Sequence, residues 1–357
     1  MVPSSSVVRG ALLGGALLAL GACAAAPVAP APKPAAAQPA AKPPPPPVVA
    51  APPPVIVPEV FESDDFTVAF AKEGDTAESL AQRYLGDPAK AWMIEDYNQI
   101  TRFAPGQEVI IPRRSWNPSG VDPSGYQLVP VLCYHNIGPQ AKGRLVIAAK
   151  TFEDQMRYLK TQGYHVISLK ELLEFTALKR QLPQKTVVLT FDDGWKSFRQ
   201  YAEPLLKELG FPATLFIYTD FLGARVAMSW EDLRELAAEG YDIEAHSKTH
   251  ADMRRKPGES DADYSRRMEA ELAQPLVLFQ KNLGRTPLIL AYPYGSHDDQ
   301  VERRTREVGY VAALDVRRQG NPSFAQLLAI HRSQIYSEMT LEDFAKNLNT
   351  FNQEVIK

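Results

Sequence analysis

The sequence predicts an α/β domain built on a largely parallel sheet or barrel, with a small β-α-α-β unit before it. Three observations predict this arrangement. From about residue 126 onward, apolar strand-like runs alternate with amphipathic helical patterns, as expected where helices join parallel strands. Between about residues 64 and 113, two short alternating runs flank two helical patterns. Before that, alanine, proline and valine dominate, and such a composition cannot form a core.

The first 22 residues have the pattern of a signal peptide. Arg9 is a short positive region, and the run Gly10 to Gly21 is rich in small residues and leucine. This run is too short for a comfortable transmembrane helix and is typical of a cleaved signal. It ends in Leu20-Gly21-Ala22-Cys23, which resembles the bacterial lipobox, whose cysteine is lipidated. We expect residues 1–22 to be removed and Cys23 to carry a membrane anchor; the alternative is ordinary cleavage near an Ala-x-Ala site.

Residues 23–62 then form a linker rich in proline and alanine that leans towards extended polyproline geometry. It serves either as a tether or as a spacer without a required length. If Cys23 is lipidated, Cys133 has no disulfide partner, and its apolar surroundings predict a buried, inert thiol. Ala24, in place of an aspartate after the lipidated cysteine, is compatible with transfer to an outer membrane. We expect the cell envelope as location, at the outer membrane or the periplasmic face in a Gram-negative cell.

The small unit is expected to span residues 63–114. Phe66–Phe70 alternates like a strand, and Glu108–Pro112 is a second strand after the turn at Pro105-Gly106-Gln107. Gly74-Asp75-Thr76 offers a turn and a helix N-cap. Two helical stretches follow it, Ala77 to Tyr84 and Ala89 to Tyr97.

This βααβ unit resembles a LysM domain. The matching motifs are Gly74-Asp75-Thr76, Leu80-Ala81, Tyr97-Asn98 and Pro105-Gly106-Gln107 with its Ile-Pro ending. The resemblance implies binding of chitin-like or peptidoglycan glycans, with Gly74, Asp75, Thr76 and Asn98 as candidate contact residues. The alternative is a degenerate module that no longer binds sugar.

The larger domain is expected to span residues 126–357. Amphipathic stretches such as Thr151–Gln162, Ser197–Leu209 and Trp230–Ala238 lie between its strand-like runs. Chemistry in parallel α/β folds sits at the carboxyl ends of the strands. The expected strands are Leu128–Tyr134, Thr186–Phe191, Ala213–Tyr218, Tyr241–Ala245, Leu288–Tyr292, Tyr310–Leu314 and Leu327–Ile330.

Candidate catalytic side chains stand at these strand ends. Asp192 and Asp193 close one strand, and adjacent residues of a strand point to opposite sides, so the two carboxylates need not do the same job. The next motif supplies His246 and His250, which at i and i+4 can share one face of a helical turn. Two histidines and one aspartate, with positions left open for water and substrate, are the arrangement of a catalytic zinc site.

Two further strand ends carry Tyr292-Pro293-Tyr294-Gly295 and Ile330-His331-Arg332. With all four motifs in this order, residues 126 to about 345 resemble the polysaccharide deacetylase family, also called the NodB-homology family or carbohydrate esterase family 4. The resemblance implies a distorted (β/α) barrel and a divalent metal, of which Zn²⁺ is expected and Co²⁺ or Ni²⁺ can occupy a similar site. The implied roles are Asp192 as general base, Asp193, His246 and His250 as metal ligands, the Tyr294 N–H as oxyanion donor, and His331 as general acid.

Two positions depart from the family pattern. Many members carry an arginine two residues before the proline of the third motif, where it orients the catalytic aspartate, and this chain has Ala291 there. The fourth motif is not recognisable in Leu314 to Pro322, and we expect Asp315 to orient His331 instead. Branches without that arginine exist, including enzymes that act on secreted poly-N-acetylglucosamine.

The remaining polar candidates have weaker signals. His135 follows the first strand and either supports the site or makes local hydrogen bonds. Trp195 either stacks on a sugar ring or packs internally. His297 is expected to be solvated and His165 structural, and Glu244 is expected to point to the other side of its strand.

The sequence therefore predicts metal-dependent hydrolysis of N-acetyl groups on a GlcNAc-containing envelope polysaccharide, peptidoglycan or exported poly-N-acetylglucosamine, with release of acetate. The alternatives are a glycan-binding scaffold with an inactive deacetylase domain and an esterase for O-acetyl groups. The net charge of -3, without a basic stripe, argues against nucleic acid as the main partner. We expect an N-acetylated polysaccharide and, through the anchor, a membrane as partners, and we infer no protein partner.

Overall fold

The computed structural model describes residues 60–355, which form a small unit and a larger barrel; each is described by itself. The predicted signal peptide, Cys23 and nearly all of the linker lie outside the described residues. Within residues 60–355, no helix is both long and apolar enough to cross a membrane.

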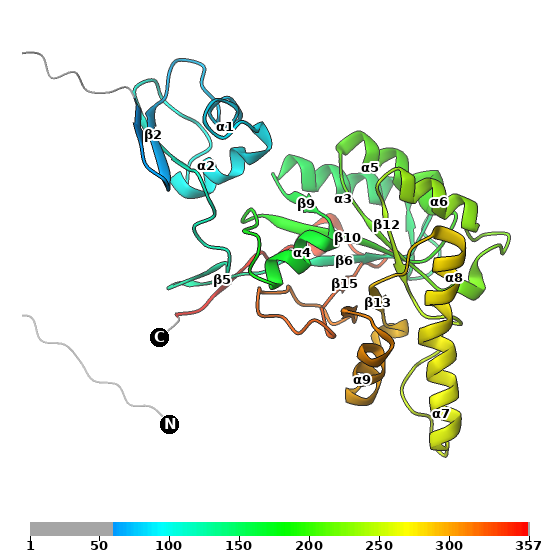
Figure 1. Ribbon diagram of the computed structural model, residues 1–357. Helices are drawn as coiled ribbons and strands as arrows, with labels where there is room; N and C mark the ends of the chain where they lie inside the picture. Colours follow the sequence, from blue (N-terminus) through cyan, green and yellow to red (C-terminus); the bar gives the residue numbers. More distant parts are fainter. Residues whose placement is uncertain (1–59, 356–357) are drawn as a thin grey trace, which may run out of the picture. The chain divides into compact units, whose positions relative to one another are not determined.

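The small unit is a three-stranded antiparallel sheet with helices between its second and third strands (Figure 1). Strands β2 and β3 have the bounds predicted from the sequence, whereas β1 was not predicted. Leu80, Ile94 and Ile111 pack in its core. The elements are β1 (Val60–Glu62), β2 (Phe66–Phe70), α1 (Ala77–Leu85), the 3-10 turn η1 (Pro88–Lys90), α2 (Ala91–Asn98) and β3 (Glu108–Pro112).

The barrel is built on one sheet of parallel strands in the order β14-β13-β12-β11-β10-β6-β15. A parallel bridge between Leu314 and Ile330 brings the chain before β15 against β14, so the sheet curls onto itself. This is the (β/α) barrel architecture expected from the family resemblance. The strands are β6 (Val131–Tyr134), β9 (His165–Ile167, beside the start of β10), β10 (Thr186–Asp193), β11 (Thr214–Ile217), β12 (Asp242–Ala245), β13 (Ile289–Ala291), β14 (Ala312–Leu314) and β15 (Ser333–Gln334).

The last predicted strand is wrong in position. Residues 327–330 form a turn that ends in the Ile330 bridge, and the strand that pairs with β6 is Ser333–Gln334. Leu328 and Ile330 are buried, which explains why this segment reads as an apolar run. The true strand is only two residues long, both polar, and it follows His331 and Arg332, so it lacks the apolar alternation by which strands are found.

Helices surround the strands (Figure 1). The predicted helix at Trp230–Ala238 has the observed bounds of α6, whereas the stretch Ser197–Leu209 divides into a π-helical turn, η2, and α5. The helices are α3 (Ala149–Thr161), α4 (Leu169–Thr176), η2 (Phe198–Ala202), α5 (Glu203–Leu209), η3 (Thr219–Phe221), α6 (Trp230–Ala238), α7 (Asp261–Met268), η4 (Glu269–Ala273), α8 (Gln274–Leu283), η5 (Pro293–Gly295), α9 (Asp299–Val308) and α10 (Leu341–Ala345).

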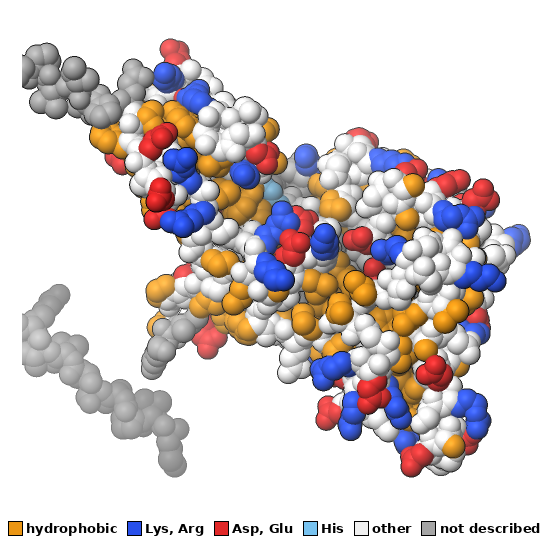
Figure 2. Space-filling model, in the orientation of Figure 1, with side chains coloured by type: hydrophobic (Ala, Val, Ile, Leu, Met, Phe, Trp, Pro, Cys, Tyr) orange, Lys and Arg blue, Asp and Glu red, His pale blue; other side chains and the backbone are white. Residues whose placement is uncertain are grey.

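Two short sheets complete the barrel domain. They are the antiparallel set β4 (Val121–Asp122), β5 (Gly125–Gln127) and β16 (Phe351–Gln353), and the parallel pair β7 (Asn136–Gly138) and β8 (Val146–Ala148). On the face shown in Figure 2, Lys and Arg side chains are interspersed with Asp and Glu. That face therefore has no stripe of positive charge of the kind that binds phosphate backbones.

Strand β10 shows how the fold positions the site. Its alternate residues Val187, Leu189 and Phe191 pack in the core shared with the surrounding helices, whereas Val188 belongs to a second core cluster with residues of β6, β11, β13 and β14. Thr190 and Asp192 follow Val188 at intervals of two and therefore share its side of the sheet. At the carboxyl end of the strand, that side changes from apolar to polar.

Candidate active site

Asp192 and Asp193 end β10, and the backbone sends their carboxylates in different directions. Asp192 keeps the strand geometry and is buried. Asp193 has a φ of 76°, in the left-handed region that non-glycine residues seldom adopt. Such strain, of about 1–3 kcal/mol, is typical of functional sites. The kink turns the Asp193 carboxylate towards the loop that follows β12.

His246 and His250 lie in that loop, where the expectation of a helical turn is wrong: residues 246–250 are outside any helix. Ser247 and His250 have φ values of 71° and 63°, and the Ser247 hydroxyl accepts a hydrogen bond from the His250 N–H at 3.0 Å. The carboxylate of Glu271 accepts from two further backbone N–H groups of the loop. These contacts bring the two imidazoles together through the shape of the loop, and not through the i, i+4 spacing of a helical turn.

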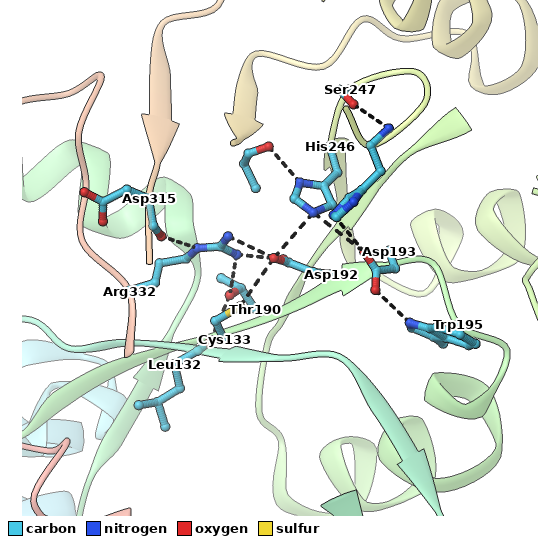
Figure 3. A network of polar contacts seen from close by, with 12 residues as sticks. Leu132, Cys133, Thr190, Asp192, Asp193, Trp195, His246, Ser247, Asp315 and Arg332 are labelled. Atoms are coloured by element: carbon cyan, nitrogen blue, oxygen red, sulfur yellow. Dashed lines mark hydrogen bonds and ion pairs between the residues drawn. The ribbon is translucent and has the colours of Figure 1, made fainter. Parts of the chain in front are cut away.

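The residues predicted as metal ligands converge, and Figure 3 shows two of them, Asp193 and His246. Asp193 Oδ1 lies 3.7 Å from His246 Nε2 and 3.6 Å from His250 Nε2. This oxygen is buried and has no hydrogen-bond partner, whereas Asp193 Oδ2 accepts from the indole N–H of Trp195 at 2.8 Å. An unpartnered carboxylate oxygen that faces two imidazole nitrogens fits a divalent cation, and one carboxylate with two histidines is a donor set that zinc accepts.

His246 is prepared for the same purpose. Its Nδ1 lies 2.7 Å from the carbonyl oxygen of Ala291, which can only accept, so Nδ1 donates and Nε2 is left with its lone pair. Burial lowers the pKa of His246 to about 4, against the opposing effect of Asp192 and Asp193. The ring is therefore neutral at neutral pH, as metal ligation requires.

Asp192 is held by a residue that the sequence analysis missed, Arg332 (Figure 3). Arg332 Nη1 and Nη2 donate to the two carboxylate oxygens at 2.6 and 2.9 Å, and both side chains are buried. Burial raises the pKa of Asp192, but the nearby charges of Arg332, His246 and His135, together with the Arg332 hydrogen bond, outweigh it and hold this pKa well below its usual range. The sequence held a partial signal: an arginine next to the apolar run that ends at Ile330 would need a compensating partner if buried, but the run does not say which residue that partner is.

Arg332 thus gives Asp192 a basic partner, although this chain has Ala291 at the position where an arginine was looked for in the sequence. Arg332 Nε also donates to the carbonyl oxygen of Asp315 at 3.0 Å, and Nη1 contacts the Thr190 hydroxyl at 3.3 Å. Four of its contacts therefore fix the guanidinium in one orientation. The departure at Ala291 consequently does not leave Asp192 without a basic partner.

Two residues of the first strand region adjoin Asp192. The Cys133 thiol donates to Asp192 Oδ2 at 3.3 Å, and burial raises the pKa of this thiol well above its usual range. His135 lies close enough to group with Cys133 and Asp192, and its buried Nδ1 has no partner. The structure therefore places His135 at the site, where the sequence analysis left a local role open.

His331 lies with Asp315, as expected. Its Nδ1 is 3.0 Å from Asp315 Oδ2 and 3.2 Å from Oδ1. The backbone of His331 is fixed on both sides by Asn321, whose side chain accepts from the His331 N–H and donates to its carbonyl oxygen. His297, expected to be solvated, instead has 14% of its side chain exposed and contacts Asp315, so that expectation is wrong.

Tyr294 lies in the η5 turn with a φ of 59°, and its ring centroid is 4.6 Å from that of His250. Its side chain is largely exposed, so the residue stands at the rim beside the candidate metal ligands. The Trp195 indole donates to Asp193 and packs on Phe221 at 4.8 Å between ring centroids, and the side chain is partly buried. Glu244 accepts from the N–H groups of Leu288 and Ile289 and so joins β12 to β13.

The candidate glycan contacts of the small unit have internal partners. Asp75 binds Arg83 through both carboxylate oxygens, at 3.1 and 2.6 Å, and Thr76 caps α1 by accepting from the Ser79 N–H. Asn98 bonds to the backbone of Ile94 and Ile110. Gly74 has a φ of 82°, in the region that favours glycine. The Asp75 and Thr76 side chains therefore hold the start of α1, and Asn98 joins α2 to β3. Sugar binding by these residues stays a prediction.

Comparison with known proteins shows that the barrel is similar to other proteins. Residues 179–313 match the family model of the polysaccharide deacetylases, a match that includes Asp192, Asp193, His246, His250 and Tyr294 and ends before Asp315. The YxkH protein of Bacillus subtilis, provisionally named a polysaccharide deacetylase, is 26% identical over 212 residues, which cover 59% of this chain and 73% of that protein.

Two further relatives are named poly-beta-1,6-N-acetyl-D-glucosamine N-deacetylase. The Escherichia coli K12 protein is 21% identical over 299 residues, which cover 71% of this chain and 42% of that protein. The Staphylococcus aureus MRSA252 protein is 29% identical over 163 residues, which cover 43% of this chain and 55% of that protein. The chain thus spans about half of the length of these two relatives.

Solved structures share the fold. The Streptococcus pyogenes deacetylase PplD, in complex with acetate, has a TM-score of 0.55 at 22% identity and covers 63% of this chain and 100% of its own. IcaB from Ammonifex degensii has a TM-score of 0.55 at 22% identity, and the match covers 63% of this chain and 99% of that one. BC0361, a polysaccharide deacetylase from Bacillus cereus, has a TM-score of 0.52 at 25% identity, and the match covers 70% of this chain and 74% of that one.

Proposed function

We propose, from the premise that the barrel is a polysaccharide deacetylase domain, that this chain hydrolyses N-acetyl groups of a GlcNAc-containing polysaccharide and releases acetate. One observation carries the proposal. Asp193, His246 and His250 gather around an unpartnered carboxylate oxygen, beside a second carboxylate held by Arg332. A metal-ligand set next to a separate, oriented base is what hydrolysis of an unreactive amide requires.

Asp192 would accept the proton of the attacking water. Its Oδ2 lies 3.7 Å from His246 Nε2, so the carboxylate reaches the edge of the ligand set. Arg332 keeps Asp192 ionised and fixes its plane, which also makes it a weak base. A divalent cation on Asp193, His246 and His250, which we expect to be Zn²⁺, would complement that weakness, because it polarises the acetyl carbonyl and lowers the pKa of water.

His331 would donate a proton to the departing sugar amine. Asp315 holds its Nδ1, so Nε2 is the ring nitrogen left to meet substrate. The N–H of Tyr294 would stabilise the oxyanion, a role that backbone donors commonly fill. Each product amine becomes cationic at neutral pH, so the reaction would change the charge of the polymer.

Exported poly-N-acetylglucosamine is the substrate that we propose first. Two relatives bear the name of an N-deacetylase for this polymer, and this chain lacks the family arginine at Ala291. Peptidoglycan is the second candidate, because the small βααβ unit resembles a LysM domain and would hold the enzyme near cell-wall glycan. Lipidation of Cys23 would place both units at the cell envelope.

Acetate release from defined substrates tests the function. The full-length chain is assayed with β-1,6-linked and β-1,4-linked N-acetylglucosamine oligomers, with peptidoglycan and with O-acetylated xylan. We expect release from the β-1,6-linked oligomer, with Asp192→Asn at least about 100-fold slower. Faster release from peptidoglycan would move the assignment to the second candidate.

Two results would overturn the proposal. Turnover of O-acetylated xylan alone would make the chain an esterase. Glycan binding without acetate release, with zinc, cobalt and nickel each supplied in turn, would make it a binding scaffold.

A further inference from the structure

Asp315 contacts two imidazoles. His331 Nδ1 lies 3.0 Å from Asp315 Oδ2, and His297 Nε2 lies 3.5 Å from the same oxygen. The other ring nitrogen of His297, Nδ1, lies 2.9 Å from Glu302 Oε1 in α9. A chain of four side chains therefore runs from Glu302 through His297 and Asp315 to His331.

The geometry determines the charge of His297. A neutral imidazole donates from only one nitrogen, but both nitrogens of His297 face carboxylates, so only the imidazolium satisfies both neighbours. The hydrogen bond to Asp315 raises the pKa of His297, against the effect of burial, and Glu302 raises it further. The ring is fixed because it stacks on Tyr292, with centroids 4.8 Å apart and planes 12° apart.

We propose that His297 is a positioning residue for proton transfer by His331: as a cation held between Glu302 and Asp315, it shares the Asp315 carboxylate and weakens the hold of that carboxylate on the His331 proton. The inference rests on the proposed function, in which His331 is the general acid. An imidazolium whose proton is stabilised less by a neighbouring carboxylate is a stronger acid, and it transfers that proton more readily to the departing amine.

The other charged groups nearby do not replace His297. The Asp298 carboxylate caps α9 by accepting from the N–H groups of Gln300 and Val301. Arg317 reaches the Asp315 carboxylate through its backbone N–H, at 2.9 Å, and Arg332 donates to the Asp315 carbonyl oxygen. Arg306 acts electrostatically on Tyr292 and makes no contact with the Asp315 carboxylate among the contacts of the described residues. His297 is thus the cationic side chain that these contacts place on the Asp315 carboxylate besides His331.

Removal of the His297 charge should change the acidity of His331 in one direction. Asp315 would then interact with His331 and the Arg317 N–H alone, so the pKa of His331 would rise. His331 would be a weaker acid, but it would stay protonated to higher pH. The maximal kcat should fall, and the basic limb of the kcat profile should move to higher pH.

The test compares the full-length wild type with His297→Gln and His297→Phe. Gln keeps a hydrogen-bonding group without the charge, and Phe keeps a ring for Tyr292 to stack on. The first measurement is kcat and KM against pH with the N-acetylglucosamine oligomer that wild type uses. The second is titration of the His331 ring by NMR, assigned among the six histidines by substitution, which needs no turnover.

Both variants should raise the His331 midpoint by about 0.5–1 pH unit, shift the basic limb equally and lower kcat at least about 3-fold with little change in KM. An unchanged His331 midpoint in both variants would overturn the inference, even if kcat fell, because a merely structural role lowers the rate without moving the midpoint. An inactive wild type would instead overturn the proposed function, and the NMR titration would still decide the effect of His297 on His331.

Discussion

Arg332 is the largest of the fully buried side chains in residues 60–355. Its guanidinium is paired with the carboxylate of Asp192, which accepts two of its hydrogen bonds. A buried ion pair contributes little net stability compared with an apolar pair of the same volume. Loss of one member is different, because the other charge is left buried without a partner. This pair therefore couples the fold of the barrel to the state of the candidate base.

We predict that Arg332→Met lowers the free energy of unfolding by about 3–5 kcal/mol and the rate of acetate release by at least about 100-fold. Arg144→Met is the matched control, since it removes an exposed pair with Glu338 and should cost at most about 1 kcal/mol. The double variant Arg332→Met/Asp192→Leu should regain stability but no activity. Urea unfolding and the acetate assay measure both quantities; equal losses for Arg332→Met and Arg144→Met would contradict the account.

At the same scale, the sequence could predict the residues that belong to local motifs. Asp192, Asp193, His246 and His250 stand at or just after strand ends, which a parallel sheet gathers at one edge. Arg332 could not be assigned in this way, because its partner lies 140 residues away and nothing local marks the pairing. His297 was missed because a histidine in a polar loop gives no sign that two carboxylates from other segments will surround it.

Among the elements, the loop after β13 shows how a close backbone approach arranges the site. Gly295 has a φ of 66°, and a Cβ there would lie 2.4 Å from Val316 Cγ2 and 2.6 Å from Val316 N. The glycine lets this loop, which carries Tyr294, pack directly against the residue that follows Asp315. A methyl group would separate the two segments, since backbone atoms cannot move aside cheaply.

Gly295→Ala should therefore destabilise the barrel and slow acetate release. Gly284→Ala is the control, because Gly284 has a φ of 68° but nothing within 4 Å of the added Cβ. Both variants pay about 1 kcal/mol for the left-handed backbone, and Gly295→Ala should cost about 1–3 kcal/mol more from overpacking. If urea unfolding gave the same loss for both, contact with Val316 would not matter to the fold.

Most elements could be predicted because each buries one side, and the apolar residues of that side recur at the period of a helix or of a strand. β2, β3 and α6 have the predicted bounds, and β10 extends the predicted strand by two residues, Asp192 and Asp193. The last strand was misplaced because its two residues, and the two before them, are polar. The loop of His246 and His250 could not be foreseen, since left-handed backbone at Ser247 and His250 is stabilised by contacts from other elements.

For the whole molecule, the expected barrel is confirmed by its strand order and by the solved structures with the same fold. The alternation of strand-like and helical runs predicted a largely parallel sheet or barrel, and the family resemblance implied the barrel. Glycan binding by the small unit and lipidation of Cys23 stay predictions: the first depends on a surface shape that composition does not encode, and the second lies outside the described residues.

The most direct test of the central claim is the metal dependence of acetate release by the full-length chain. Wild type and Asp193→Asn are treated with a chelator, and zinc content and acetate release are measured before and after zinc is returned. The account predicts that wild type loses its activity on chelation and regains it with about one zinc per chain, whereas Asp193→Asn binds zinc at least about 10-fold more weakly and stays slow. Acetate release that survives complete removal of metal, or that Asp193→Asn supports as fast as wild type, would contradict it.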